Sequence, residues 1–207
     1  MSTPLPACAK GAFSSPAPSG PIAIFSCRRP GWRQNGCMQR VAVLGCAGAG
    51  KTTLALEMGK ALALPVVHLD GLYWRSGWVE TPAEEWREIV AQIVRGERWI
   101  IDGNYGGTLD ARLAAADTAV FLDFPTSLCL RRIVVRRIRY RGRSRPDMAP
   151  GCPEKIDWEF VAWVATFRRK SRPHVLESLA KHEHLRVVTL RNPHEVARFV
   201  EGLRGSS

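Results

Sequence analysis

Five short segments of the chain are almost continuously hydrophobic, which is typical of strands that are covered on both faces of a sheet. These segments comprise residues 40–45, 65–70, 98–102, 118–124 and 185–190. In the longer segments that follow, hydrophobic residues recur at helical spacing. We therefore expect helices over residues 52–64, 82–96, 126–140, 157–182 and 193–203.

This alternation of strands and helices favours a single α/β domain, built as a five-stranded parallel sheet with helices on both faces. Ligands of such sheets bind beyond the carboxyl ends of the strands. The residues that directly follow the strands are therefore the first candidates for a functional site. They are Gly45 and its successors, Asp70, Asp102, Asp123 and Arg191.

The first 38 residues differ in composition from the rest of the chain. They hold six prolines and many serines and glycines, and they contain no Asp or Glu. A segment of this kind has little hydrophobic surface to bury, so we interpret residues 1–38 as a disordered N-terminal extension. The folded domain is expected over residues 39–205.

Composition narrows the class of protein and its partners. The 207 residues include 30 Lys and Arg against 19 Asp and Glu, which indicates a polyanionic partner such as nucleotide phosphates, nucleic acid or an anionic surface. The six cysteines have neither CxxC nor metal-site spacing, as in a cytoplasmic protein with reduced thiols. No hydrophobic run approaches the ~20 residues of a membrane span. We therefore expect a cytoplasmic protein without a membrane partner.

The segment GCAGAGKT, between the first strand and the first helix, matches the phosphate-binding pattern G-x-x-x-x-G-K-[ST]. Glycines allow the backbone to wrap around a phosphate with its N–H groups pointing inward, and the following helix adds its free N–H groups. In this pattern the Lys51 ammonium reaches the β- and γ-phosphates, and the Thr52 hydroxyl binds Mg²⁺. The predicted ATP-binding residues are Gly45, Cys46, Ala47, Gly48, Ala49, Gly50, Lys51, Thr52 and Thr53.

Several motifs together resemble known P-loop proteins. GCAGAGKTT, WIIDGNY and RRIVVRR resemble the P-loop, the third strand and the arginine-rich helix before the lid of adenylate kinase and related small-molecule kinases. Over residues 40 to 203 the chain is most similar to the adenylate-kinase-related topology modulation proteins. The further motifs that carry this similarity are HLDGLYWRSGW, LDFP and RIVVRRIRYRGRSRPDMAPGCPEK. The resemblance implies a nucleoside-monophosphate-kinase-like fold with a short arginine-rich lid at about residues 139–155. The adenylate kinase arginine motifs on the acceptor side have no counterpart here, which argues against AMP as the acceptor.

The acidic residues at strand ends are candidates for metal binding and catalysis. Asp102 ends the third strand, which adjoins the P-loop strand in the fold that the resemblance implies. For this reason we favour Asp102 over Asp123 as the carboxylate that supports Mg²⁺. In sugar and shikimate kinases a carboxylate at the position of Asp70 orients or deprotonates the acceptor hydroxyl; the alternative is a turn cap. Because His68 alternates with Asp70, we expect it to point away or to pack.

Three aromatic residues, Tyr73, Trp74 and Trp78, follow Asp70. They suit either the binding of a planar or sugar-like acceptor or a hydrophobic flap that packs on the core.

Arginines are concentrated between residues 131 and 145, where eight of them occur without an acidic residue. Similarity to adenylate kinase implies that Arg132 stacks on the nucleotide base and that Arg136 contacts phosphates. With Arg137 as a neighbour, Arg136 would stabilise the charge of the phosphoryl group during transfer. A nucleic-acid-binding surface and a solvated helix face are the alternatives.

These features predict an enzyme that uses ATP and Mg²⁺ to transfer the γ-phosphate to an unidentified small acceptor, either a nucleotide or a metabolite. In this interpretation Lys51, Asp70, Arg136 and Arg137 are the catalytic residues, and Thr52 and Asp102 hold the metal. The alternative is a nucleotide-dependent regulatory ATPase that acts on nucleic acid or on a protein partner.

Overall fold

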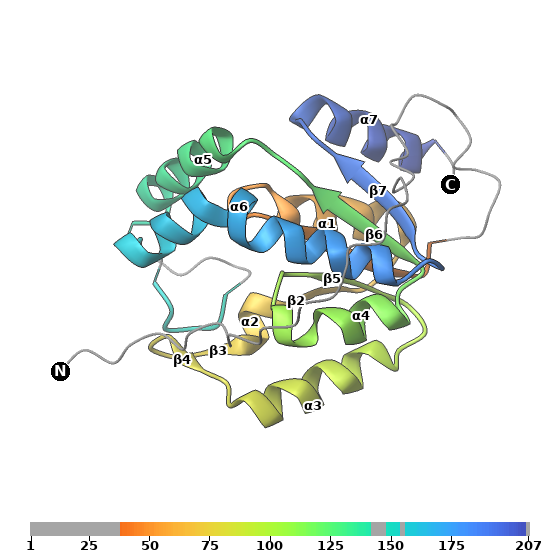
Figure 1. Ribbon diagram of the computed structural model, residues 1–207, viewed down its shortest axis with the longest axis horizontal. Helices are drawn as coiled ribbons and strands as arrows, with labels where there is room; N and C mark the ends of the chain where they lie inside the picture. Colours follow the sequence, from red (N-terminus) through yellow and green to blue (C-terminus); the bar gives the residue numbers. More distant parts are fainter. Residues whose placement is uncertain (1–37, 142–147, 154–155, 206–207) are drawn as a thin grey trace.

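The computed structural model describes residues 38–141, 148–153 and 156–205. The expected N-terminal extension, apart from Met38, and residues 142–147 and 154–155 of the expected lid lie outside these residues. The strands of the main sheet are β1 (Arg40–Gly45), β2 (Val66–His68), β5 (Trp99–Asp102), β6 (Thr118–Leu122) and β7 (Arg186–Leu190). They pair in parallel in the order β2-β5-β1-β6-β7 (Figure 1). The P-loop strand β1 is therefore central, between β5 and β6, as the resemblance implied.

Helices cover both faces of this sheet. They are α1 (Lys51–Leu62), α3 (Ala83–Val94), α4 (Leu109–Ala115), α5 (Thr126–Arg139), α6 (Trp158–Lys181) and α7 (Pro193–Arg204). Alternate side chains of β1 point to opposite faces, as the period of a strand requires. Val41 and Val43 pack in one core cluster with α1 and α7, whereas Ala42 and Leu44 pack in the other with α3 and α4. The predicted α/β architecture is confirmed.

A segment between β2 and α3 departs from the predicted pattern. The second strand ends at His68, and Asp70 lies in the short helix α2 (Leu69–Tyr73), so Asp70 does not directly follow the strand as predicted. An antiparallel hairpin of β3 (Trp74–Arg75) and β4 (Val79–Glu80) follows α2. The sequence pattern did not predict this hairpin, α4 or the 3-10 turn η1 (Gly106–Thr108) before α4, because each is too short to show a clear period.

Among the described residues, none of the helices combines the length and the hydrophobicity that crossing a membrane requires.

Candidate nucleotide and acceptor site

The loop between β1 and α1 has the backbone geometry of a phosphate cradle. Gly45, Gly48 and Gly50 adopt φ angles of 145°, 78° and 97°, a region that favours glycine. A Cβ atom at Gly48 would lie 2.5 Å from the carbonyl oxygen of Cys129 on α5. The first turn of α1 contains no acidic residue, so its free N–H groups and positive dipole end are available to an anion. The loop conformation thus requires the glycines of the motif.

The P-loop residues divide between the cavity and the core. Ala47, Gly48 and residues 50–53 line a cavity of about 1050 Å³. The side chains of Cys46 and Ala49 turn into the core, where these residues are 3% and 2% exposed. Hydrogen bonding to Cys129 and burial raise the pKa of the Cys46 thiol. The Cys46 thiol is therefore a packing group in this loop.

Two side chains hold the first residue of the P-loop. The Lys51 ammonium donates to the carbonyl oxygens of Gly45 at 3.0 Å and Cys46 at 3.2 Å. The Asn104 side-chain amide pairs with both backbone groups of Gly45: its Oδ1 accepts from the N–H at 3.1 Å, and its Nδ2 donates to the carbonyl at 2.8 Å. Asn104 therefore ties the segment after β5 to the phosphate loop.

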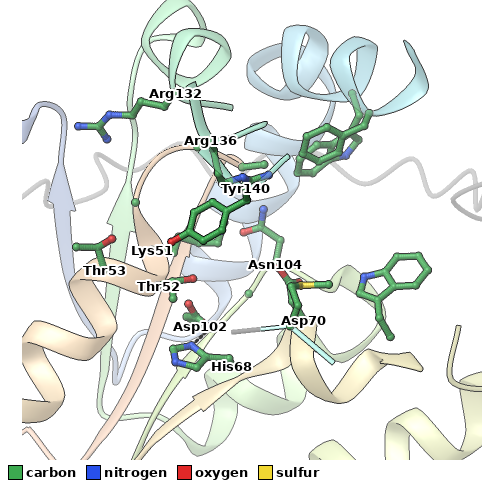
Figure 2. Close-up of a pocket in the computed structure, with 18 of the residues that line it drawn as sticks. Lys51, Thr52, Thr53, His68, Asp70, Asp102, Asn104, Arg132, Arg136 and Tyr140 are labelled. Atoms are coloured by element: carbon green, nitrogen blue, oxygen red, sulfur yellow. Dashed lines mark hydrogen bonds and ion pairs between the residues drawn. The ribbon is translucent and has the colours of Figure 1, made fainter. Parts of the chain in front are cut away.

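Asp102 lies beside the P-loop at the end of β5 and is only 4% exposed. Its partner in the β2–β5 ladder is His68, and the His68 Nδ1 lies 3.0 Å from the Asp102 Oδ1. Both residues line the cavity together with Thr52. The prediction that His68 points away or packs is wrong, because strand pairing sets it next to Asp102. In Figure 2, Lys51, Thr52, Asp102 and His68 succeed one another along one side of the cavity.

Asp70 lines the same cavity from helix α2. It accepts a hydrogen bond of 2.7 Å from the phenol of Tyr105, and burial followed by the charge of Asp70 raises the pKa of that phenol. Tyr105 stays protonated as a donor, so it holds the Asp70 carboxylate in a defined orientation at the cavity wall.

Arg112 is a residue of this site region that the sequence analysis missed. Its side chain is fully buried beneath the segment after β5. Nη1 donates to the carbonyl of Gly103 at 2.8 Å, and Nη2 donates to the carbonyls of Asn104 at 2.5 Å and Tyr105 at 3.2 Å. Burial lowers the pKa of Arg112 to about 10. No sequence signal marked it, because an isolated arginine in a helix is normally exposed.

The structure separates the predicted α5 arginines. Arg132 and Arg136 line the cavity, and Figure 2 shows Arg136 and Tyr140 projecting toward the Lys51 side. Arg132 also donates to the Ala49 carbonyl at 3.0 Å. Arg137 does not line the cavity, and within the described part of the chain its Nη1 is enclosed without a hydrogen-bond partner. The geometry therefore brings two of the three predicted arginines to the site.

Asp123, the alternative metal carboxylate, is committed to a structural ion pair. Its two oxygens accept from Nε and Nη2 of Arg172 on α6, both at 2.8 Å, and this contact raises the pKa of Arg172. Asp123 is absent from the cavity lining, whereas Asp102 and Thr52 contribute to it. A carboxylate and a hydroxyl are the hard oxygen ligands that suit Mg²⁺, which takes its other ligands from water and phosphate. The residues present thus fit Mg²⁺ with a nucleotide.

Sequence comparison relates the chain to a bacterial protein. No protein-family model matches the chain. The chain is 26% identical over 149 residues to the uncharacterized protein YqaC of Bacillus subtilis (strain 168), a match that covers 70% of this chain and 81% of that protein.

Two solved shikimate kinases have a similar structure. The enzyme from Bacteroides thetaiotaomicron matches with a TM-score of 0.51 and 19% sequence identity, and the match covers 82% of this chain and 98% of the enzyme's chain. The enzyme from Acinetobacter baumannii, solved in complex with shikimate, matches with a TM-score of 0.50 and 15% sequence identity, and the match covers 79% of this chain and 89% of the enzyme's chain. These likenesses show that the chain shares its α/β fold with the two shikimate kinases.

Proposed function

We propose that the protein is an ATP-dependent phosphotransferase that moves the γ-phosphate of ATP to a hydroxyl group of a small acceptor. The observation that carries this proposal is the composition of one cavity. Its walls include the phosphate loop with Lys51, the oxygen ligands Thr52 and Asp102, and the carboxylate of Asp70. An enzyme of this class needs a donor site, a metal site and a hydroxyl-orienting group at one place.

Each side chain has a role that follows from its chemistry. The loop amides and Lys51 bind the phosphates, and Thr52 and Asp102 hold Mg²⁺, which offsets phosphate charge when bound. Arg136 reaches the site from α5 and stabilises charge on the transferred oxygens. Arg132 flanks the loop, where we propose that it contacts the nucleotide.

Asp70 acts on the acceptor. It orients the acceptor hydroxyl and accepts its proton as the hydroxyl oxygen bonds to the γ-phosphorus. The bond from that phosphorus to the β–γ bridging oxygen breaks, and the products are ADP and a phosphate ester. Arg137 is left out of this scheme because it does not line the cavity.

The finer assignments of the sequence analysis form part of the same proposal. We propose that residues 39–205 constitute the P-loop kinase-like domain of a cytoplasmic protein related to the topology modulation proteins. The shared motifs support that relationship. No part of the proposal depends on an effect on DNA topology.

The experiment that tests this function measures ADP release. The purified protein is incubated with ATP, Mg²⁺ and single hydroxyl compounds, with duplex DNA and RNA as further additives. A phosphotransferase releases ADP rapidly only with its acceptor and forms a phosphate ester detectable by mass spectrometry. Lys51→Ala, which removes a phosphate ligand and leaves the core intact, should abolish both signals.

A regulatory ATPase would give a different pattern in the same assay. ADP release would respond to DNA, RNA or a protein partner and yield inorganic phosphate, and a response to nucleic acid would fall steeply with salt. That result would refute the proposed transfer to a small acceptor.

A further inference from the structure

The cavity has walls of opposite charge. The cationic lining residues other than His68 belong to the P-loop and α5: they are Lys51, Arg132, Arg136 and Arg139. Another wall is formed by the α2–β4 segment; its charged lining residues are Asp70 and Glu80, and among the described residues it presents no Lys or Arg to the cavity. The start of α6, the helix that packs against α5, adds Asp157 and Glu159 to the lining. The nucleotide phosphates belong on the first wall, so the second is left for the acceptor.

Glu80 has an aromatic neighbour on this acceptor wall. It is the cross-strand partner of Trp74 in the β3–β4 hairpin, so the two side chains leave the same face of the hairpin and both line the cavity. Glu80 Oε2 accepts a hydrogen bond of 3.1 Å from the Tyr73 phenol. Within the described part of the chain, Glu80 makes no ion pair.

A pair of tyrosines fixes the spacing between Glu80 and Asp70. Tyr73 donates to Glu80, Tyr105 donates to Asp70, and the two tyrosine rings pack with their centroids 4.7 Å apart. Both carboxylates are half-buried, and Asp70 also makes no ion pair with a described residue. Each carboxylate is therefore held in place by a neutral donor, and neither has a cationic partner among the residues that the structure describes.

Aromatic rings line the cavity on this wall and on α6. Trp74 and Trp78 form an edge-to-face pair at 5.3 Å, and the Trp78 indole N–H donates to the Pro153 carbonyl at 3.1 Å. On α6, Phe160 and Trp163 stack at 6.2 Å. All four rings line the cavity. Aromatic faces attract cations through their quadrupole, and an adjacent carboxylate adds a direct charge.

Building on the proposed function, we infer that the acceptor is a hydroxyl compound that carries a protonated amine. Glu80 binds the ammonium group against Trp74, while Asp70 takes the proton of the hydroxyl whose oxygen bonds to the γ-phosphorus as ADP leaves. An anionic acceptor would meet carboxylates of like charge. A neutral acceptor would bury Glu80 further without supplying a cation, which is unfavourable for a charged group.

Acceptors of similar size that carry a positive, a zero or a negative charge test this inference. Glucosamine, glucose and glucuronate form one set, and ethanolamine, ethylene glycol and glycolate form another. Binding to the protein without ATP is followed by tryptophan fluorescence, and transfer is followed by phosphate ester formation. The amine should bind at least tenfold more tightly than its neutral and anionic partners and have the highest kcat/KM.

The matched variants are Glu80→Gln and Glu88→Gln. Gln at position 80 can still accept from Tyr73, so only the charge is removed, and Glu88 is an exposed residue of α3. Glu80→Gln should raise the KM of the amine at least tenfold, change kcat less than threefold and leave ATP affinity unchanged. Glu88→Gln should behave as wild type.

The outcomes separate the two proposals. Phosphate transfer with equal or better use of the neutral or anionic compounds would overturn the amine inference and leave the phosphotransferase proposal standing. Preference for the amine that survives Glu80→Gln would also overturn it. ATP binding without transfer to any compound would refute the proposed function, and the inference with it.

Discussion

Replacing Arg112 by methionine tests whether this buried arginine holds the segment that carries Asn104. Methionine is also long and flexible, so it fills most of the space without donating a hydrogen bond. The carbonyls of Gly103, Asn104 and Tyr105 would lose the buried guanidinium that they share in the wild type. These are the backbone positions directly after Asp102, so the change acts on the site without touching a ligand.

The expected loss follows from two opposing contributions. The carbonyls of Gly103 and Asn104 are left unsatisfied, at about 1–3 kcal/mol each, whereas the Tyr105 carbonyl still accepts from the Thr108 N–H at 3.1 Å. Burial lowers the pKa of Arg112 to about 10, so removing the charge recovers roughly 3 kcal/mol of desolvation. The net destabilisation is about 1 kcal/mol, which for a chain of this size lowers Tm by about 2–4 °C.

Urea denaturation and thermal melting of Arg112→Met measure this loss. Arg87→Met is the matched control, because Arg87 is exposed and forms a surface pair with Glu84 on α3; its effect should stay below about 0.5 kcal/mol. Titration with ATP and Mg²⁺ should show weaker binding by Arg112→Met at a temperature where it is folded. If Arg112→Met were as stable as Arg87→Met and bound ATP normally, the assigned role of the buried arginine would be refuted.

Three further predictions concern the phosphate loop and the metal. Gly48→Ala should lower Tm and abolish ATP binding in calorimetry, because Gly48 has a left-handed conformation and a Cβ there would lie 2.5 Å from a carbonyl oxygen of α5. Gly106→Ala is the control, because a Cβ at Gly106 would meet no atom within 4 Å, and it should leave ATP binding unchanged. Asp102→Asn should raise the Mg²⁺ concentration needed for half-maximal ATP binding at least tenfold. Asp123→Asn should lower the urea midpoint and keep the wild-type Mg²⁺ requirement. The reverse pattern would assign the metal to Asp123. Asn104→Ala loses two hydrogen bonds to the first P-loop glycine, at about 1 kcal/mol each, and should weaken ATP binding up to about 30-fold in the same titration.

The elements that could be predicted from the sequence are those with a local cause. The strand cores and most helices show their period over enough residues to be recognised, and the five-stranded parallel sheet follows from their alternation. The P-loop was recognisable because its glycines serve a backbone conformation that the motif itself specifies. Asp102 could be proposed because it ends a hydrophobic strand, and parallel sheets bind ligands at that edge.

The short elements and the cross-chain contacts could not be predicted in this way. The hairpin that pairs Trp74 with Glu80 has two residues in each strand, too few to show alternation. His68 was expected to point away because its position was judged along one strand. The ladder between β2 and β5 decides that it faces Asp102.

The sequence alone determined that this protein has a phosphate loop in an α/β domain, because a loop motif and hydrophobic periods are written in neighbouring residues. Tertiary structure decided what surrounds that loop. The strand order sets His68 beside Asp102, the packing of α6 removes Asp123 from the cavity, and burial turns Arg112 into a support for Asn104. These pairs are separated by 8 to 49 positions in the chain, and only the folded contacts define the charge and hydrogen-bond partners of each side chain.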